Sequence, residues 1–321
     1  MTSLTSFFMF NTQDALQIIR KIYAAGYPPE YNQDSAVTTP DFEALDQLLI
    51  KPSCSRDEFS GILDGCGELV QTVQDEAVPA TILQRDVLAV IHSSIAYIYR
   101  QRGNRKEAVS SLVIAQEIAS GHFAKARSFE ELALLYRFLE PRDLNIAVVY
   151  GIGSLNGYKA CRSGVKSARI RGILGSCYME RNNPGDTDFA EPCFKTDLDY
   201  QLLHGDDYGK ANAHHNMGKL HMAREDHEEA LNEFDISIGL YKKNGFKRET
   251  INLLVYKAWA MSHINPVDTI GLLEEINGSK ADSHEGDRRI MEGVIQKIFE
   301  QLSPNPITEQ LFPELMAHYM G

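Results

Sequence analysis

The sequence predicts an all-α fold made of stacked antiparallel helix pairs. Strand signals are nearly absent, and helical segments of roughly twelve to twenty residues alternate with short turns rich in Gly, Asn, Pro and Asp. Small side chains also recur along the chain with a period close to 40 residues. A single helix pair leaves an apolar face uncovered, so repeated pairs must stack to bury it.

The period is visible at two positions in each pair. The first helices carry it at residues 96, 135, 175, 218 and 258, with steps of 39, 40, 43 and 40; the second helices carry it at 108, 147, 190, 230 and 270, with steps of 39, 43, 40 and 40. Small residues there let two helices approach closely. A larger residue four positions later, such as Phe234 after Ala230, fills the gap toward the next pair. Two pairs fit less well: Leu135 is not small and Gly151 takes the place of Phe, and Ile270 stands where a small residue is expected.

Helices outside the period are predicted at both ends. Segments 12–26, 40–50 and 56–76 have amphipathic helical patterns, and so does segment 286–302. A last helix at the C-terminus is expected to kink or break at Pro313. The sequence therefore predicts three parts: residues 1–79 as an N-terminal helical cap or a small separate bundle, residues 80–280 as about five helical hairpins, and residues 281–321 as C-terminal capping helices.

Composition argues against nucleic-acid and membrane partners and favours a reducing compartment. Thirty-two basic residues against forty-four acidic residues leave a formal charge of −12, which argues against nucleic acid or an anionic membrane as the main partner. The five cysteines are scattered, odd in number and without a CxxC motif, as expected for reduced thiols. The sequence has no convincing signal peptide and no apolar stretch of about 18 residues. We therefore expect a cytoplasmic protein.

No catalytic, metal or cofactor site is predicted. Four histidines, His214, His215, His221 and His227, lie within fourteen residues, but no two of them have the i, i+4 spacing of a helical metal site. His214 and His221 share a helix face about 10 Å apart, too far for one zinc ion. Residues 151–157, GIGSLNG, lack the GK[ST] ending of a phosphate loop and lie inside a helical repeat.

The repeated segments resemble the tetratricopeptide repeat (TPR) family, in its longer variety of about 40 residues. The residues that fall on signature positions of the family are Ala96, Tyr99, Gly103, Ala108, Ala115, Leu174, Gly175, Tyr178, Met217, Gly218, Ala230 and Phe234. The resemblance covers about residues 85–280, without the usual proline at the end of the second helix. It implies a right-handed superhelical solenoid with helical caps. In this reading His214 and His221 pack against the partner helix.

The resemblance also implies a concave groove lined by the first helix of each repeat. Carried onto this chain, the groove positions hold a polar and aromatic set: Ser94, Tyr97, Tyr136, Arg169, Asn212, His215, Asn216, Lys219, Asn252, Tyr256 and Trp259. Asparagine amides can both donate to and accept from a peptide backbone. Arg169 and Lys219 could hold a carboxylate, and the aromatic residues could anchor apolar side chains.

Three functions are compatible with the sequence. The first is a non-catalytic interaction scaffold or adaptor that binds a peptide or protein segment in the groove. The second is a peptide-sensing regulator whose N-terminal helices contact an effector; residues 1–75 have no basic recognition helix, so this effector would be a protein and not DNA. The third is an enzyme on a helical scaffold, for which the sequence contains no motif. Neither the partner nor the oligomeric state follows from the sequence.

Overall fold

The computed structural model describes residues 14–19, 39–49, 56–75, 82–278 and 285–302, together with residue 313. Residues 14–19 are helical, and no strand occurs in the described part of the chain. The other helices are α2 (Thr39–Leu49), α3 (Arg56–Asp75), α4 (Ile82–Gln101), α5 (Arg105–Ile118), α6 (His122–Phe138), α7 (Leu144–Ala160), α8 (Gly164–Arg181), α9 (Asp186–His204), α10 (Asp207–Ala223), α11 (His227–Lys243), α12 (Lys247–Ile264), α13 (Pro266–Gly278) and α14 (Glu285–Leu302).

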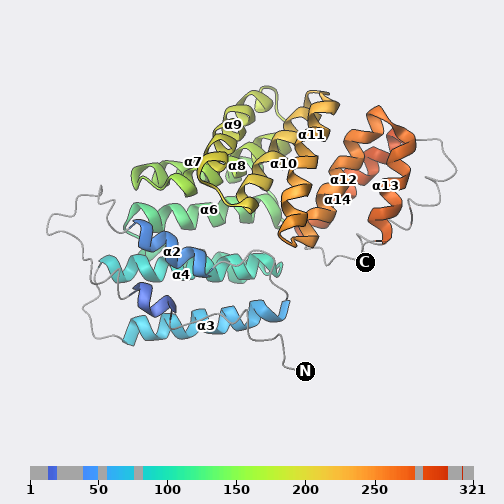
Figure 1. Cartoon of the computed structure of the whole chain (residues 1–321). Coiled ribbons are helices and arrows are strands. Elements are labelled where there is room, and N and C mark those ends of the chain that lie inside the picture. The colour runs from blue at the N-terminus through green and yellow to red at the C-terminus, as the bar shows by residue number, and fades with distance from the viewer. Residues whose placement is uncertain are drawn as a thin grey trace. The chain divides into compact units, whose positions relative to one another are not determined.

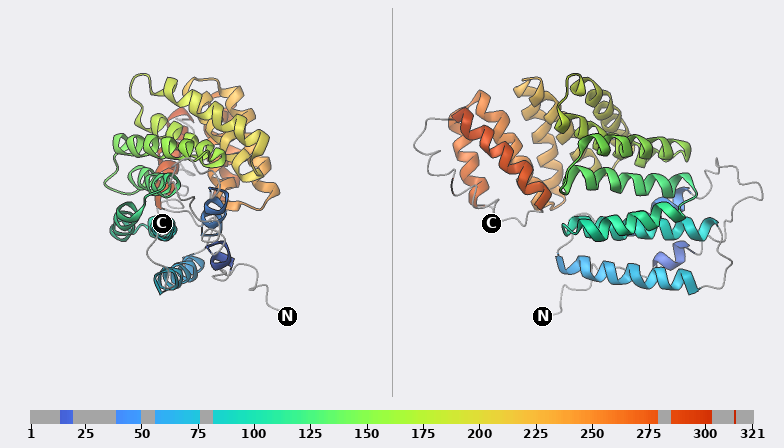
Figure 2. Two further views of the ribbon diagram at one scale, coloured as in Figure 1. Left: turned by 90° about the vertical axis from the view of Figure 1, so that its left-hand side faces the viewer. Right: turned by 180° about the vertical axis from the view of Figure 1, so that it is seen from behind.

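The chain divides into two compact units, Met1–Ile170 (unit 1) and Arg171–Gly321 (unit 2). In unit 1, α4 pairs with α5 and α6 pairs with α7, while α2 and α3 both pack on α4. Figure 1 shows α3, α4 and α6 stacked in order within this unit. In unit 2, α10 pairs with α11, α12 pairs with α13, and α14 packs on α12. Figure 2 gives two further views of the same pairs.

Short turns with left-handed glycines or side-chain caps separate consecutive helices. Gly103 between α4 and α5 and Gly245 between α11 and α12 both adopt φ 74°, a left-handed conformation that suits glycine. Asp143 begins α7 by accepting hydrogen bonds from the backbone N–H groups of Asn145 and Ile146, and the side chain of Asp206 accepts from Gly209 at the start of α10. These carboxylates satisfy N–H groups that a helix start leaves without an intrahelical acceptor.

Glycines at the crossing points allow the close helix approach that the period predicts. A Cβ atom on Gly175 of α8 would lie 2.5 Å from Cε1 of Phe194 on α9, and one on Gly218 of α10 would lie 2.3 Å from Cε1 of Phe234 on α11. Both phenylalanines are fully buried. The bare backbone of each glycine is therefore the surface against which a ring of the second helix packs.

The two weaker repeats also pack as helix pairs. In the second pair Leu135 is fully buried and Gly151 is buried, so the large residue stands on the first helix and the small one on the second. In the fifth pair Ala258 is fully buried, and Ile270 packs against the core of unit 2 from its partly buried position. The departures from the pattern therefore change side-chain size at the crossing without changing the pairing.

The all-α fold of stacked helix pairs is thus confirmed, as are the helices expected near residues 40–50, 56–76 and 286–302. The division into residues 1–79, 80–280 and 281–321 stays a prediction. The expected C-terminal helix near Pro313 lies outside the described residues except for that proline. Among the described helices, none combines the length and apolarity required to cross a bilayer.

Candidate functional site

Seven of the predicted groove residues lie on two neighbouring first helices of unit 2, α10 and α12. We call this set the α10–α12 cluster: Asn212, His215, Asn216, Lys219, Asn252, Tyr256 and Trp259. All are partly buried except Tyr256, which is 4% exposed. Residues at i, i+3, i+4 and i+7 share one face of a helix, so the four members on α10 form a continuous row. Both helices belong to the packed core of unit 2.

Two asparagines of the cluster are held by hydroxyl groups. The Tyr241 hydroxyl of α11 donates to Oδ1 of Asn212 at 2.8 Å, and the Ser176 hydroxyl of α8 donates to Oδ1 of Asn216 at 3.3 Å. Burial raises the pKa of Tyr241 well above its ordinary value, so this hydroxyl keeps its proton. With both carbonyl oxygens engaged, the amide nitrogens of Asn212 and Asn216 have no acceptor among the described residues. They are the groups that can donate to a ligand carbonyl.

Aromatic and cationic side chains of the cluster pack against one another. The His215 ring lies 4.9 Å from the Tyr256 ring, and Nζ of Lys219 lies 5.9 Å from the same tyrosine ring. Trp259 is partly exposed, packs on the core of unit 2 and receives Nζ of Lys297 from α14 at 4.6 Å from its ring. These distances are within the range of cation–π attraction. The rings are therefore fixed in place, which lowers the entropy cost of using the partly exposed Trp259 ring as an anchor.

A buried carboxylate lies behind Asn216. A Cβ atom on Gly172 of α8 would lie 2.5 Å from Oδ2 of Asp197 on α9 and 3.3 Å from Nδ2 of Asn216. Asp197 is 4% exposed and accepts a hydrogen bond from Gln201 at 3.1 Å. Burial raises its pKa to about 6, against the smaller opposing effects of Gln201 and Arg171. This carboxyl group therefore changes charge close to neutral pH, next to a predicted ligand-binding amide.

The four predicted groove residues of unit 1 are engaged by side chains or backbone of the same unit. Ser94 is fully buried and donates to the Val90 carbonyl within α4, and Tyr97 is 7% exposed beside Arg100. Tyr136 lies between Arg105, at 4.9 Å from its ring, and Tyr150, stacked at 5.9 Å. Arg169 pairs with Glu130 at 2.9 Å, so its guanidinium already holds a carboxylate of the protein itself.

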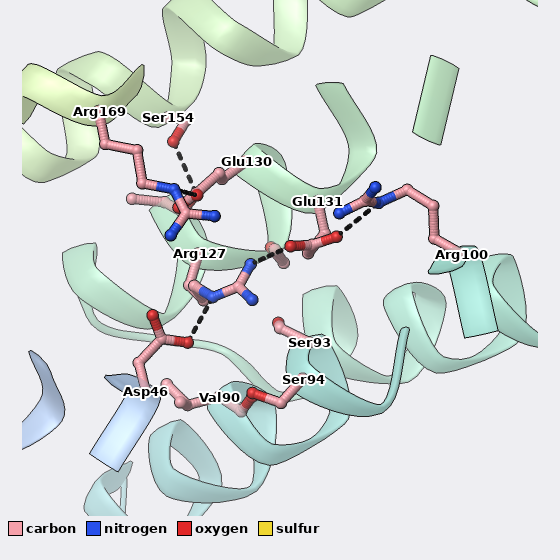
Figure 3. Close-up of polar contacts among 12 residues, drawn as sticks. Asp46, Val90, Ser93, Ser94, Arg100, Arg127, Glu130, Glu131, Ser154 and Arg169 are labelled. Atoms are coloured by element: carbon pink, nitrogen blue, oxygen red, sulfur yellow. Dashed lines mark hydrogen bonds and ion pairs between the residues drawn. The ribbon is translucent and has the colours of Figure 1, made fainter. Parts of the chain in front are cut away.

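A buried network of charges connects four helices of unit 1 (Figure 3). Arg127 of α6 has no exposed surface and pairs with Asp46 of α2 at 2.5 Å and with Glu131 of α6 at 2.9 Å. Arg100 of α4 takes the other oxygen of Glu131 at 3.0 Å, and Lys166 of α8 donates to the other oxygen of Asp46. The sequence prediction did not include this network. The segment 127–131, RSFEE, which places three charged residues beside the apolar run LALL of the same helix, was the available signal.

A second branch of the network surrounds Glu130. The hydroxyl of Tyr158 on α7 donates to Glu130 at 2.6 Å, while Arg169 binds the other carboxylate oxygen. Burial alone would raise the pKa of Glu130, but attraction to Arg169, Lys166 and Arg127 outweighs it and lowers that pKa below its ordinary value. Burial also opposes the charge of Arg127, yet attraction to Asp46 and Glu131 raises its pKa well above the ordinary range. Arg127 and Glu130 are therefore both ionised at neutral pH.

The histidine-rich stretch contacts neighbouring side chains. Nδ1 of His214 lies 2.6 Å from Glu233 on the partner helix α11, and Nδ1 of His221 lies 3.5 Å from Asp226. The His227 ring stacks on His263 of α12 at 4.1 Å. No three His, Cys, Asp or Glu side chains among the described residues come together as metal ligands. His214, His221 and His227 therefore each contact a side chain of the protein, namely Glu233, Asp226 and His263.

Comparison with known proteins shows likeness in structure only. No model of a known protein family matches the chain, and no curated protein matches its sequence. Among solved structures, a Rap protein complexed with competence and sporulation factor is similar over 96% of this chain and 88% of that one, with a TM-score of 0.59 and 11% identity. The apo form of the quorum sensor NprR from B. thuringiensis is similar over 96% and 94%, with a TM-score of 0.53 and 10% identity.

A third similar solved structure contains a tetratricopeptide repeat sensor. It is a signal transduction ATPase with numerous domains and a tetratricopeptide repeat sensor from Pyrococcus horikoshii, similar over 96% of this chain and 55% of that one, with a TM-score of 0.55 and 12% identity. Identities this low show the fold alone. The chain therefore has a TPR-like helical repeat fold.

Proposed function

We propose that this protein is a non-catalytic cytoplasmic scaffold that binds an extended peptide or protein segment at the α10–α12 cluster. The observation that carries the proposal is the pair of oriented amides: Asn212 and Asn216 have their carbonyl oxygens engaged by hydroxyls and their amide nitrogens available. Four residues apart, they lie one helical turn from each other on α10. Two donors in that arrangement suit alternate carbonyl groups of an extended backbone, which point to the same side and lie about 6.6 Å apart.

The remaining members of the cluster fit the side chains of such a segment. Trp259 offers a partly exposed aromatic surface of the kind that dominates binding energies in interfaces, and the buried Tyr256 ring supports His215 and Lys219 from below. Lys219 adds a positive charge beside Tyr256 and could attract a carboxylate of the ligand. The proposal rests on unit 2 because the amide nitrogens of Asn212 and Asn216 lack an acceptor among the described residues, whereas Arg169 of unit 1 already binds Glu130. Assignment of the repeats to the longer variety of TPR is part of the same proposal.

A regulatory function is the second candidate. The solved structures with this fold include a Rap protein complexed with competence and sporulation factor and the quorum sensor NprR. In this chain Asp46 links the N-terminal helix α2 to α6 and α8 through buried charges. A peptide-sensing regulator would use such a link to pass a change in the repeats to N-terminal helices that contact an effector.

The test uses selection of peptides and two matched variants. Peptides selected from a displayed random library on the wild-type chain are titrated against Asn216→Ala/Trp259→Ala and against Asn232→Ala, which removes an exposed asparagine from α11. We expect at least about tenfold weaker binding to the double variant, equal to about 1.4 kcal/mol, and unchanged binding to Asn232→Ala. Equal binding to all three proteins would show that the cluster is not the site.

The selected peptides also distinguish a passive scaffold from a regulator, through two further readouts. A regulator changes its hydrodynamic radius, or the hydrogen exchange of its N-terminal helices, when the selected peptide binds. A passive scaffold keeps both unchanged. Both readouts use the full chain at saturating peptide.

A further inference from the structure

Helix α2 lies on the first helices of the repeats in unit 1. It packs on α4, stacks Phe42 on Phe123 of α6 at 5.7 Å between ring centroids, and directs Asp46 to Arg127 of α6 and Lys166 of α8. Its Glu43 accepts a hydrogen bond from Ser163, just before α8. The contacts of α2 thus fall on α4, α6 and α8, the three first helices of the unit. We call the surface beneath α2 the α2 seat: Phe123, Arg127, Ser163 and Lys166.

The α2 seat is positively charged when α2 is left out. The network then contains four cations, Arg100, Arg127, Lys166 and Arg169, and two carboxylates, Glu130 and Glu131. The difference of four and two leaves two positive charges, of which one is buried, because the Arg169 side chain is 40% exposed whereas Arg100, Arg127 and Lys166 are buried. Asp46 supplies the carboxylate that Arg127 and Lys166 both bind. Because uncompensated buried charges are costly, the seat selects an acidic occupant.

The charge balance at Arg127 leaves room for a further acceptor. Its side chain has no exposed surface, and its Nη2 atom has no partner among the described residues. Figure 3 shows this guanidinium between Asp46 and Glu131. With Asp46 in place, the buried cations Arg100, Arg127 and Lys166 are matched by three buried carboxylates, and the fourth cation, Arg169, is 40% exposed. The seat therefore prefers a negatively charged occupant, because Arg127 and Lys166 both need the carboxylate that α2 supplies.

The apolar part of the contact has the spacing of a helix that docks in a groove. Phe42 is 3% exposed, Leu45 is fully buried and Leu49 is 1% exposed, and together with Asp46 they occupy i, i+3, i+4 and i+7. This is the anchor pattern of an amphipathic helix laid into an apolar surface. The recognised pattern is thus an aromatic residue followed one turn later by a carboxylate, with leucines beside them.

The energetics favour an exchangeable occupant. Helix α2 has eleven residues, and isolated helices of that length are marginal in water, so its helical state depends on the seat. Buried ion pairs add little net stability compared with apolar contacts, but their geometry fixes register. We propose that the α2 seat is a docking site for amphipathic acidic helices, occupied at rest by α2, and that a partner protein's helix with an aromatic residue and a carboxylate one turn apart takes its place.

The test uses a labelled synthetic peptide of residues 39–49 as the probe. Its binding by fluorescence anisotropy is compared between the wild-type full chain and the full-length variant Phe42→Ala/Asp46→Asn, whose own α2 is weakened. We expect at least about tenfold tighter binding to the variant, because its seat is less well occupied. A peptide with Asp46→Asn should bind at least about tenfold more weakly, since it leaves Arg127 and Lys166 without their carboxylate. A peptide with Asp41→Asn is the matched control and should bind like the unmodified one.

A second measurement keeps the proposal testable if the double variant does not fold. Hydrogen exchange of residues 39–49 in the wild-type full chain is followed with and without excess unlabelled peptide. We expect faster exchange of α2 and unchanged protection of α6 when peptide is present. Unchanged exchange of α2 overturns the proposal, and so does equal binding of the unmodified peptide and the Asp46→Asn peptide in the anisotropy assay.

Discussion

Replacing Gly218 by alanine tests the packing rule on which the fold depends. An added Cβ would lie 2.3, 2.6 and 2.9 Å from Cε1, Cδ1 and Cζ of Phe234, a ring that is fully buried. Carbon atoms in contact normally lie about 3.5–4.0 Å apart, so the ring must move by more than about 1 Å. Overpacking of this kind costs about 1–3 kcal/mol. Alanine regains about 1 kcal/mol of helix propensity, which leaves a net loss of up to about 2 kcal/mol.

The matched control is Gly239→Ala on α11. Gly239 is exposed, and nothing lies within 4 Å of the Cβ that the substitution would add. This variant should gain up to about 1 kcal/mol from helix propensity alone. The helix-propensity gain is the same at both positions, so Gly218→Ala should be less stable than Gly239→Ala by the overpacking cost alone, about 1–3 kcal/mol.

Urea unfolding followed by circular dichroism measures both variants. Adding Phe234→Leu to Gly218→Ala should recover part of the loss, because a smaller side chain leaves room for the methyl group, and the cycle yields the coupling between the two positions. Equal stabilities for Gly218→Ala and Gly239→Ala would refute the reasoning that the helix crossing requires the bare backbone.

Two further predictions concern buried charge. Asp197→Asn removes a carboxyl group whose pKa is raised by burial to about 6, from an ordinary 3.8. Between about pH 4 and pH 6, the native state therefore keeps a proton that the unfolded chain has already released. The stability linked to this proton is lost as the pH rises through 6. The variant should gain up to about 3 kcal/mol at pH 7.5 and nothing near pH 4 in thermal unfolding scans. Arg127→Met should lower the free energy of unfolding by about 3–5 kcal/mol, because Asp46 and Glu131 stay buried without their cation. Lys257→Met removes a more exposed pair with Asp235 and should change the free energy of unfolding by less than about 1 kcal/mol. Similar losses for both variants would contradict the importance of burial.

The repeat period identified more of unit 2 than of unit 1. Gly175 with Phe194 and Gly218 with Phe234 are small and large partners in sequence, and they are in contact in the structure. Tyr256 contacts His215 of α10 and Trp259 contacts Lys297 of α14, while their predicted place in a groove stays a prediction. Periodicity succeeds here because the contacts join neighbouring helices, whose relative placement follows from the repeat itself.

The same period could not predict what covers the first helices of unit 1. Ser94 and Tyr97 are buried, and Arg169 is paired with Glu130, although their positions in the repeat are equivalent to accessible ones elsewhere. The decisive contacts join Asp46 to Arg127, 81 residues away, and to Lys166, 120 residues away. No local pattern in segment 39–49 or segment 122–138 specifies that these two helices meet.

The sequence by itself determined the helices, their pairing and the small residues at which the pairs cross, because each of these depends on side chains within about one repeat. Tertiary structure alone decided that α2 rests on α4, α6 and α8, that four cations share three carboxylates in that contact, and that hydroxyls orient Asn212 and Asn216. The physical reason is that burial and charge pairing depend on which segments meet in space, and a period along the chain carries no information about distant segments.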